Sequence, residues 1–265
     1  MSTFTRKLAV VTGASSGIGA VYADRLAKRG YDLLLVARRE QRLTALAASI
    51  VAKYGVKAEP LGADLATEDG QSCVEAILRS NPDVHVLVNN AGIARLTPIA
   101  DSPLDNSLAQ ISLNITALTR MAHAALSPMK ARNAGVIINV SSVMALNSLA
   151  VSSVYSGTKA YVLAFTRGLQ QELAGTALRI QAVLPAATAT EVWDQSGVPL
   201  SALDPNTVMS VDDCVDAALS GLDKGESVTY PSVADLQMVE RFESSRTELF
   251  LAAQTGRVAE RYRSN

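Results

Sequence analysis

The feature that most constrains this chain is a glycine-rich turn near its start, between a short apolar run and a helical pattern. The apolar run Leu8–Val11 predicts a strand that is buried on both faces. Gly13, Gly17 and Gly19 follow it, and helical periodicity begins at Ile18. A strand that passes through such a turn into a helix presents free N–H groups and the positive end of the helix dipole to an anion. The turn therefore predicts a phosphate-binding site.

Predicted strands and helices alternate along the rest of the chain, with short connections. The expected strands after the first are Asp32–Ala37, Val56–Leu61, Val84–Val88, Gly135–Val140, Arg179–Leu184 and Val228–Tyr230. The expected helices are Gly17–Arg29, Glu40–Tyr54, Thr67–Arg79, Leu104–Met129, Ser153–Ala174 and Ser210–Leu222. This alternation is typical of the α/β class, with a doubly wound parallel sheet and helices on both faces. No repeat or linker divides residues 1–265, so we expect a single domain.

Composition and charge exclude several kinds of protein. The chain has 265 residues, 48% of them hydrophobic, and a net charge of -1, so neither nucleic acid nor an anionic membrane is an expected partner. The first seven residues contain no apolar core of a signal peptide, and no run approaches the ~18 apolar residues of a membrane span. Cys73 and Cys214 are far apart, and the two histidines form no ligand pattern, so no metal site is expected. We expect a cytoplasmic protein.

A tyrosine and a lysine with helical spacing form a candidate acid–base pair. Tyr155 and Lys159 are four residues apart, which places them on one face of a helix. A phenol has a pKa of ~10. A lysine charge at about 5 Å, with an effective dielectric of ~20, stabilises the phenolate by roughly 3 kcal/mol, which lowers the pKa of the phenol by about two units. Tyr155 is then a proton donor to a ketone and an acceptor from an alcohol. The alternative is a buried tyrosine beside a surface lysine, although none of the other six tyrosines has lysine at this spacing.

Three motifs in this order give the chain a family resemblance. The turn Thr12-Gly-x-x-x-Gly-x-Gly19, the segment Asn89-Asn-Ala-Gly92 and the pair Tyr155-x-x-x-Lys159 together resemble the short-chain dehydrogenase/reductase family, from the first strand to the last near Tyr230. The resemblance implies a Rossmann fold. It also implies an oxidoreductase that transfers a hydride between a nicotinamide and a small-molecule carbonyl or alcohol substrate.

The resemblance also implies a catalytic set. Its members are Asn114, Ser142, Tyr155 and Lys159. Ser142, thirteen residues before Tyr155, would hold the substrate oxygen, whereas alternation turns Ser141 to the other side of its strand. Asn114 would distort its helix locally and hold a water that leads to the lysine.

The cofactor residues that the resemblance implies come from several segments. They are Gly13, Ser15, Ser16, Gly17, Ile18, Gly19, Arg38, Asp64, Asn90, Ala91, Gly92, Tyr155, Lys159, Pro185, Thr188 and Thr190. Asn90 would brace the central sheet, while Ala91 and Gly92 leave room for the adenine ribose. Asp64 would bond the adenine amino group, or else serve only as a surface turn. After Pro185 the family pattern is changed, because Ala186 replaces a glycine and Thr188 an apolar residue.

The cofactor type is predicted from the end of the second strand. NAD-specific folds place an acid there to accept hydrogen bonds from the ribose diol. This chain has Ala37 followed by Arg38 and Arg39, while Glu40 lies too far along. An arginine can grip a 2′-phosphate through two hydrogen bonds. We therefore favour NADP(H), read by Arg38, with NAD(H) possible if both arginines are merely solvated.

The substrate pocket is expected from segments 93–98, 143–154 and 186–209. Their apolar residues are Met144, Leu146, Leu149, Val192 and Trp193, which indicates an apolar ketone or aldehyde. We expect substrate contacts from Ser142, Met144, Tyr155 and Trp193, although Trp193 could instead pack beneath its own loop.

Two other functions remain open. The first is a 3-oxoacyl-thioester reductase, although Val136 stands where carrier-protein reductases often have arginine. The second is a non-catalytic dinucleotide sensor, which would not need the four catalytic residues that this chain keeps.

The last segment, residues 231–265, extends beyond the expected sheet. Leu236, Val239, Phe242, Leu249 and Phe250 indicate an amphipathic helix that serves as a lid over the pocket or as a subunit contact. The resemblance further implies a homo-oligomer, a dimer or tetramer in which the helices carrying Asn114 and Tyr155 pair across a two-fold axis.

Overall fold

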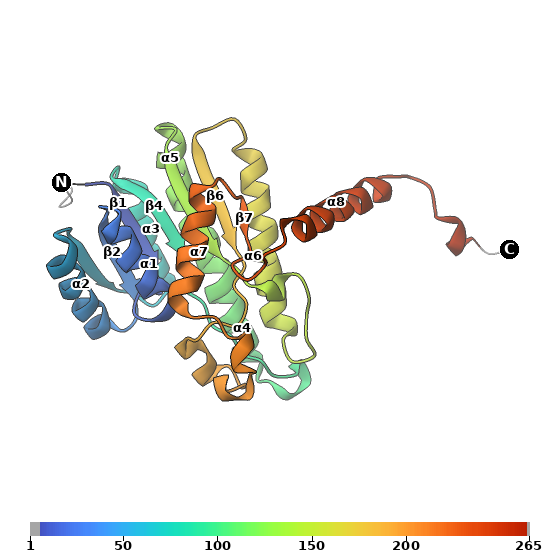
Figure 1. The fold of residues 1–265 in the computed structure, drawn as a ribbon, viewed down its shortest axis with the longest axis horizontal. Coiled ribbons are helices and arrows are strands. Elements are labelled where there is room, and N and C mark those ends of the chain that lie inside the picture. The colour runs from blue at the N-terminus through green and yellow to red at the C-terminus, as the bar shows by residue number, and fades with distance from the viewer. Residues whose placement is uncertain (1–5, 264–265) are drawn as a thin grey trace. The chain divides into compact units, whose positions relative to one another are not determined.

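A computed structural model describes residues 6–263, and its centre is a seven-stranded sheet in which every pairing is parallel (Figure 1). The strand order is β3-β2-β1-β4-β5-β6-β7. The strands are β1 (Leu8–Thr12), β2 (Asp32–Ala37), β3 (Ala58–Gly62), β4 (Val84–Asn89), β5 (Gly135–Val140), β6 (Leu178–Val183) and β7 (Val228–Thr229). The predicted doubly wound α/β fold is therefore confirmed.

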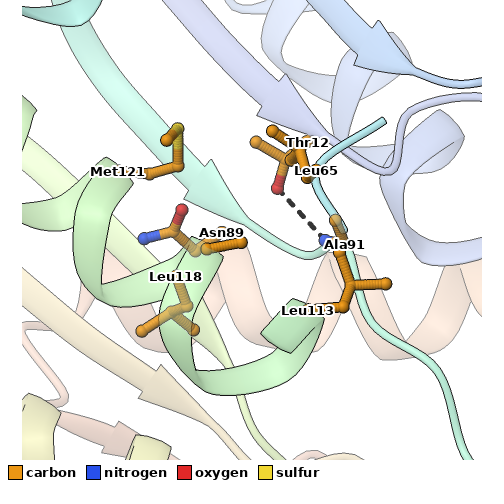
Figure 2. Close-up of a pocket in the computed structure, with 8 residues that line it drawn as sticks. Thr12, Leu65, Asn89, Ala91, Leu113, Leu118 and Met121 are labelled. Carbon is orange, nitrogen blue, oxygen red and sulfur yellow. Dashed lines mark hydrogen bonds between the residues drawn. The ribbon is translucent and has the colours of Figure 1, made fainter. Parts of the chain in front are cut away.

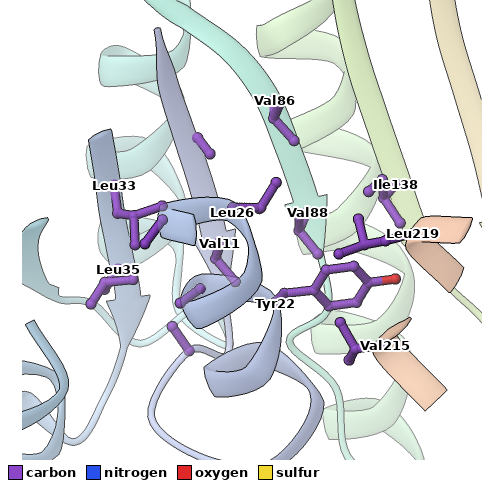
Figure 3. Packing of buried hydrophobic residues seen from close by; sticks show 14 of the residues in the cluster. Val11, Tyr22, Leu26, Leu33, Leu35, Val86, Val88, Ile138, Val215 and Leu219 are labelled. Carbon is purple, nitrogen blue, oxygen red and sulfur yellow. The ribbon is translucent and has the colours of Figure 1, made fainter. Parts of the chain in front are cut away.

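Helices cover both faces of this sheet. On one face lie α1 (Gly17–Lys28), α2 (Glu40–Tyr54) and α7 (Val211–Asp223), and on the other lie α3 (Glu68–Ser80), α5 (Leu118–Ala131) and α6 (Ser153–Glu172). All five residues of the central strand β1 are buried because each face of that strand must fill a core, whereas the edge strand β3 is only partly buried. Figure 3 shows the ring of Tyr22, from α1, between Val88 of the sheet and Val215 of α7.

The predicted long helix over residues 104–129 is not continuous. It consists of α4 (Leu104–Ile111), a π-helical turn (Ser112–Ala117) and α5. Shorter 3₁₀ turns occupy Ile99–Asp101, Val143–Ala145, Glu191–Gln195, Leu200–Ala202, Pro205–Thr207 and Glu260–Tyr262. A π-helical turn widens one turn of a helix, and such turns are frequent at functional sites.

The chain divides into two compact units at Pro231. The first unit contains the whole sheet and the helices α1 to α7. The second contains α8 (Leu236–Ala253), in which no side chain is buried. No helix in residues 6–263 is both long enough and apolar enough to cross a membrane.

Candidate active site

The carboxyl ends of β1, β4 and β5 meet at one edge of the sheet. The strand order reverses between β1 and β4, since β1 continues to β2 on one side and β4 to β5 on the other. In parallel α/β sheets such a switch point is where ligands bind. The glycine turn, the segment after β4 and the two serines after β5 all lie at this edge.

The glycine turn has the backbone that the sequence predicts. Gly13 and Gly17 have φ of +67° and +55°, values that side chains other than glycine rarely adopt. A Cβ atom at Gly13 would lie 2.8 Å from the amide nitrogen of Asn90, so the turn is packed directly against the segment after β4. At the start of α1 the N-cap residue Ser16 makes no capping hydrogen bond. The first N–H groups of the helix thus lack a side-chain acceptor, and this donor set fits a diphosphate.

Asn90 braces the turn from the side. Its side-chain amide donates to the carbonyls of Thr12 (2.9 Å) and Gly13 (3.3 Å). The Thr12 hydroxyl accepts from the N–H groups of Asn90 and Ala91 and donates to the Val88 carbonyl. Figure 2 shows the bond from Ala91 to Thr12 beside a hollow too small for a water molecule. These bonds join β1 to β4 at the predicted cofactor edge.

Tyr155 lies near two of the other members of the catalytic set, Ser142 and Lys159. Its pKa reflects an interaction with the Ser142 hydroxyl. The ammonium nitrogen of Lys159 lies 5.8 Å from the centre of the Tyr155 ring. Lys159 donates to the Val140 carbonyl at 2.9 Å. The structure thus brings Ser142, Tyr155 and Lys159 together.

The predicted fall in the tyrosine pKa is not found in the protein without a cofactor. Burial raises the pKa of Tyr155 to about 12, and the Ser142 interaction only partly opposes this. Burial also lowers the pKa of Lys159 to about 8. The expectation was wrong because it counted the attraction between the two charges and left out the loss of hydration that both groups suffer. Tyr155 therefore holds its proton throughout the neutral range.

Asn114 lies in the π-helical turn, so the helix is distorted where the resemblance implied. Its side-chain oxygen accepts from the N–H of Ile93 (2.9 Å), and its amide donates to the Ile93 carbonyl (2.9 Å) and the Thr158 hydroxyl (3.1 Å). A Cβ atom at Gly92 would lie 3.1 Å from the Asn114 oxygen and 3.7 Å from the Lys159 nitrogen. Asn114 therefore lies near Lys159. Its side-chain hydrogen bonds connect the segment after β4 to α6.

The two arginines after β2 have different surroundings. Arg38 is exposed, and its side chain has no hydrogen bond or ion pair to any described residue. Arg39 donates to the hydroxyls of Ser15 (2.9 Å) and Ser16 (2.7 Å) and to the carboxylate of Glu191 (2.6 Å). The residue that reaches the glycine turn is thus Arg39, whereas the role predicted for Arg38 stays a prediction.

The loop after β6 lies against the glycine turn at Thr190. A Cβ atom at Gly17 would lie 3.0 Å from the methyl group of Thr190. Thr188 is buried, and its hydroxyl donates to the Ala186 carbonyl. Pro185 accepts the Ser142 hydroxyl through its carbonyl at 3.4 Å. Of these three predicted cofactor residues, Thr190 is therefore the one with its side chain at the turn.

Other predicted contacts are used within the protein. The Asp64 carboxylate accepts from the Ala66 N–H, as expected if Asp64 only stabilises a surface turn. The indole N–H of Trp193 donates to the Thr188 carbonyl at 2.8 Å, so Trp193 bonds its own loop. This contact agrees with the predicted alternative to a substrate contact. Met144 is half-buried and its N–H donates to the Ser142 oxygen. Contacts of Asp64 with adenine and of Met144 and Trp193 with substrate stay predictions.

Sequence reasoning missed some residues of the site. Thr12 and Thr158 act through hydroxyl groups, and Glu191 through an ion pair. Thr12 stands inside the quoted turn motif, which was a usable signal. Thr158 and Glu191 gave none, because their partners lie 44 and 152 residues away in the chain.

Comparison with known proteins identifies the family. A sequence profile described as short chain dehydrogenase matches residues 7–198. The chain belongs to this family. The predicted resemblance is confirmed, and it covers the glycine turn, the segment after β4 and all four members of the catalytic set.

Similar structures cover nearly the whole chain. A short-chain dehydrogenase from Sphingobium yanoikuyae in complex with NADPH is 41% identical, with a TM-score of 0.93 over 97% of this chain and 99% of that one. A bulky-bulky ketone specific alcohol dehydrogenase from Comamonas testosteroni is 34% identical, with a TM-score of 0.88 over 97% and 99%.

Curated relatives are matched over a shorter part. The very-long-chain 3-oxoacyl-CoA reductase-A of Danio rerio is 37% identical over 190 residues, which are 70% of this chain and 59% of that protein. The chain thus spans about three fifths of the length of the curated relatives it matches.

Proposed function

We propose that this protein is an NADPH-dependent oxidoreductase that transfers a hydride between the nicotinamide and a ketone or secondary alcohol. The observation that carries the proposal is that Tyr155 interacts with the Ser142 hydroxyl and has the Lys159 nitrogen 5.8 Å from its ring centre. A proton donor, an oxygen-binding hydroxyl and a cation at one sheet edge are what carbonyl reduction requires. A dinucleotide sensor would need the glycine turn alone.

The residues of the chain divide the chemistry between them. The cofactor, when bound, supplies the hydride. Ser142 donates only weakly to Pro185, at 3.4 Å, so its hydroxyl can turn to a substrate oxygen. Tyr155, with a pKa of about 12, is protonated and delivers the proton to that oxygen. Lys159 keeps a positive charge beside the phenol as the proton leaves.

Support for NADPH comes from charge and from a relative. The end of β2 carries Arg38 and Arg39 and no acid that would repel a 2′-phosphate. The Sphingobium protein, 41% identical to this chain, was solved with NADPH. We propose that Arg38, which is exposed, receives the 2′-phosphate. NADH is then the weaker cofactor.

For the substrate we favour an apolar ketone with two large substituents. The Comamonas relative is described as specific for bulky-bulky ketones. Leu146 and Leu149 are 41% and 55% exposed on the segment after Ser142, so apolar side chains are available beside the site. The second candidate is a 3-oxoacyl thioester, which the name of the Danio relative supports. Val136 has no positive charge to offer such a substrate, and it packs in the core.

We also propose a cytoplasmic homo-oligomer, a dimer or tetramer. Leu104, Leu108 and Ile111 form an exposed apolar stripe on α4, 70%, 51% and 40% accessible, which supports association. In α8 the apolar Leu249 and Phe250 are exposed, which supports a lid or a subunit contact for residues 231–265. The low net charge supports no membrane or nucleic-acid partner.

The test is a set of rate measurements with NADPH and NADH. The substrates are a diaryl ketone, a small methyl ketone, an aldehyde and a 3-oxoacyl-CoA. The parent protein is compared with the variant Tyr155→Phe. We expect fastest turnover of the diaryl ketone with NADPH. Tyr155→Phe should bind NADPH normally and lose about 10²–10⁴ in rate, because only the transferred proton is removed. Preferred turnover of the thioester would replace the first candidate by the second, and turnover of Tyr155→Phe near the parent rate would contradict the mechanism.

A further inference from the structure

A cluster of five side chains joins three segments that are distant in the chain. Arg39, at the start of α2, donates to Ser15 and Ser16 of the glycine turn through its Nε and Nη2 atoms. Its Nη1 atom donates to one carboxylate oxygen of Glu191, at 2.6 Å, and Arg42 donates to the other, also at 2.6 Å. Glu191 belongs to the loop 186–209 that follows β6. We call these five residues the Arg39 cluster.

The cluster holds the loop where the cofactor is expected. Thr190, next to Glu191, packs on Gly17. The Arg39 guanidinium rests on hydroxyls that directly precede the open N-terminus of α1. The Glu191 carboxylate is therefore an anion of the protein itself, held beside a turn whose donors suit phosphate.

Glu191 stays ionised, but its exposed ion pairs with the two arginines are weak. Two arginines hold the pKa of Glu191 down to about 2, so the carboxylate is ionised at any working pH. Arg39, Arg42 and Glu191 are 43%, 50% and 43% exposed, and partly hydrated ion pairs of this kind contribute little free energy. A stronger anion could thus take the place of the carboxylate.

We propose that Glu191 is a specificity-determining residue: its carboxylate occupies Arg39 until the cofactor's 2′-phosphate displaces it and releases the loop 186–209. The inference rests on the proposed use of NADPH. A phosphate carries more charge than a carboxylate and accepts more hydrogen bonds, so it can win the exchange. A ribose hydroxyl cannot, so NADH leaves the cluster as it is. The exposed Arg38 would add a second positive charge that attracts the phosphate.

Removal of the carboxylate should then separate the two cofactor types. Glu191→Gln keeps the size of the side chain and leaves no anion to displace. We expect the dissociation constant of 2′,5′-ADP, a probe without nicotinamide, to fall by about 3- to 10-fold, as for the loss of one or two exposed pairs. The dissociation constant of 5′-AMP should stay within about twofold. Asp194→Asn is the matched control, because Asp194 lies on the same 3₁₀ turn and has no partner among the described residues.

The loop carries its own reporter of release. Trp193 is the sole tryptophan of the chain and lies two residues after Glu191. In the parent protein, acrylamide quenching of Trp193 fluorescence should rise on saturation with 2′,5′-ADP and stay constant with 5′-AMP. In Glu191→Gln it should be high without any ligand, and in Asp194→Asn it should match the parent.

Several results would overturn the inference. Unchanged quenching in ligand-free Glu191→Gln would show that the carboxylate does not hold the loop, whatever the cofactor. Weaker binding of 2′,5′-ADP by this variant would show that Glu191 supports Arg39 instead of competing with phosphate. Equal affinity of the parent for 2′,5′-ADP and 5′-AMP would overturn the exchange together with the proposed use of NADPH.

Discussion

Lys159 is the residue whose charge state sets the working range of the site. Burial lowers its pKa to about 8, while Tyr155 keeps its proton up to about 12. As pH rises, the lysine therefore loses its charge well before the tyrosine ionises. The ammonium is bonded to the Val140 carbonyl, so it is held in position for this role.

The first prediction concerns this charge. Reduction of a ketone should be constant through neutral pH and decline as pH rises through about 8, because neutral Lys159 no longer stabilises the phenolate. The kcat/KM profile with NADPH checks it. In Lys159→Arg, which stays charged, the decline should disappear from the residual activity. A decline that persists unchanged in Lys159→Arg would assign it to another group.

The second prediction concerns Arg38, whose exposed side chain bonds none of the residues 6–263. Arg38→Ala should weaken NADPH alone by roughly 1.5–3 kcal/mol, about ten- to a hundredfold, for one lost charge-assisted contact. The dissociation constants of NADPH and NADH provide the measurement, and added salt should narrow the gap between them in the parent.

The double variant extends that test. Ala37→Asp with Arg38→Ala should invert the preference, since the new carboxylate accepts from the ribose diol and repels the phosphate. Equal losses for both cofactors in Arg38→Ala would mean that this arginine supports the turn and recognises no phosphate.

At the scale of elements, the π-helical turn shows how one side chain fixes a local backbone. Asn114 satisfies both backbone groups of Ile93 and bonds Thr158 on α6. An asparagine inside a helix is unfavourable by propensity, and here these three bonds compensate it. The distortion is thus part of the link between β4 and α6.

Removal of this link is the third prediction. Asn114→Ala leaves partly buried polar groups of Ile93 unpaired, so the free energy of unfolding should fall by about 1–3 kcal/mol. Urea denaturation of the full chain measures it. Asn106→Ala on α4 is the control and should change the value by less than about 0.5 kcal/mol, because its side chain bonds no described residue. Similar losses in both variants would mean that the bonds of Asn114 contribute little.

The elements themselves could be predicted because their signals are local. Alternating apolar runs and capped helical patterns gave strands and helices within a few residues, as at β2 and α2, which match the expected bounds. The π-helical turn kept the apolar spacing of an ordinary helix, so only the resemblance pointed to it. The Arg39 cluster could not be predicted, since it depends on contacts between residues 152 positions apart.

At the scale of the whole molecule, the apolar stripe on α4 bears on assembly. The fourth prediction is that light scattering at micromolar concentration gives the mass of a dimer or tetramer. Leu108→Glu should lower that mass, because it places a charge in the middle of the stripe formed with Leu104 and Ile111. Val51→Glu, on the exposed side of α2, is the control and should leave the mass unchanged. A monomeric parent protein would contradict the proposed assembly.

The bracing of the glycine turn has a consequence for the order of events on the ribosome. The turn is complete within the first 19 residues, yet Asn90 contacts Thr12 across 78 positions and Thr190, from beyond β6, packs on Gly17. The motif that is synthesised first therefore receives its supports last. We expect a nascent chain to be unable to retain a dinucleotide until most of it has emerged. The cofactor would then bind only late in synthesis.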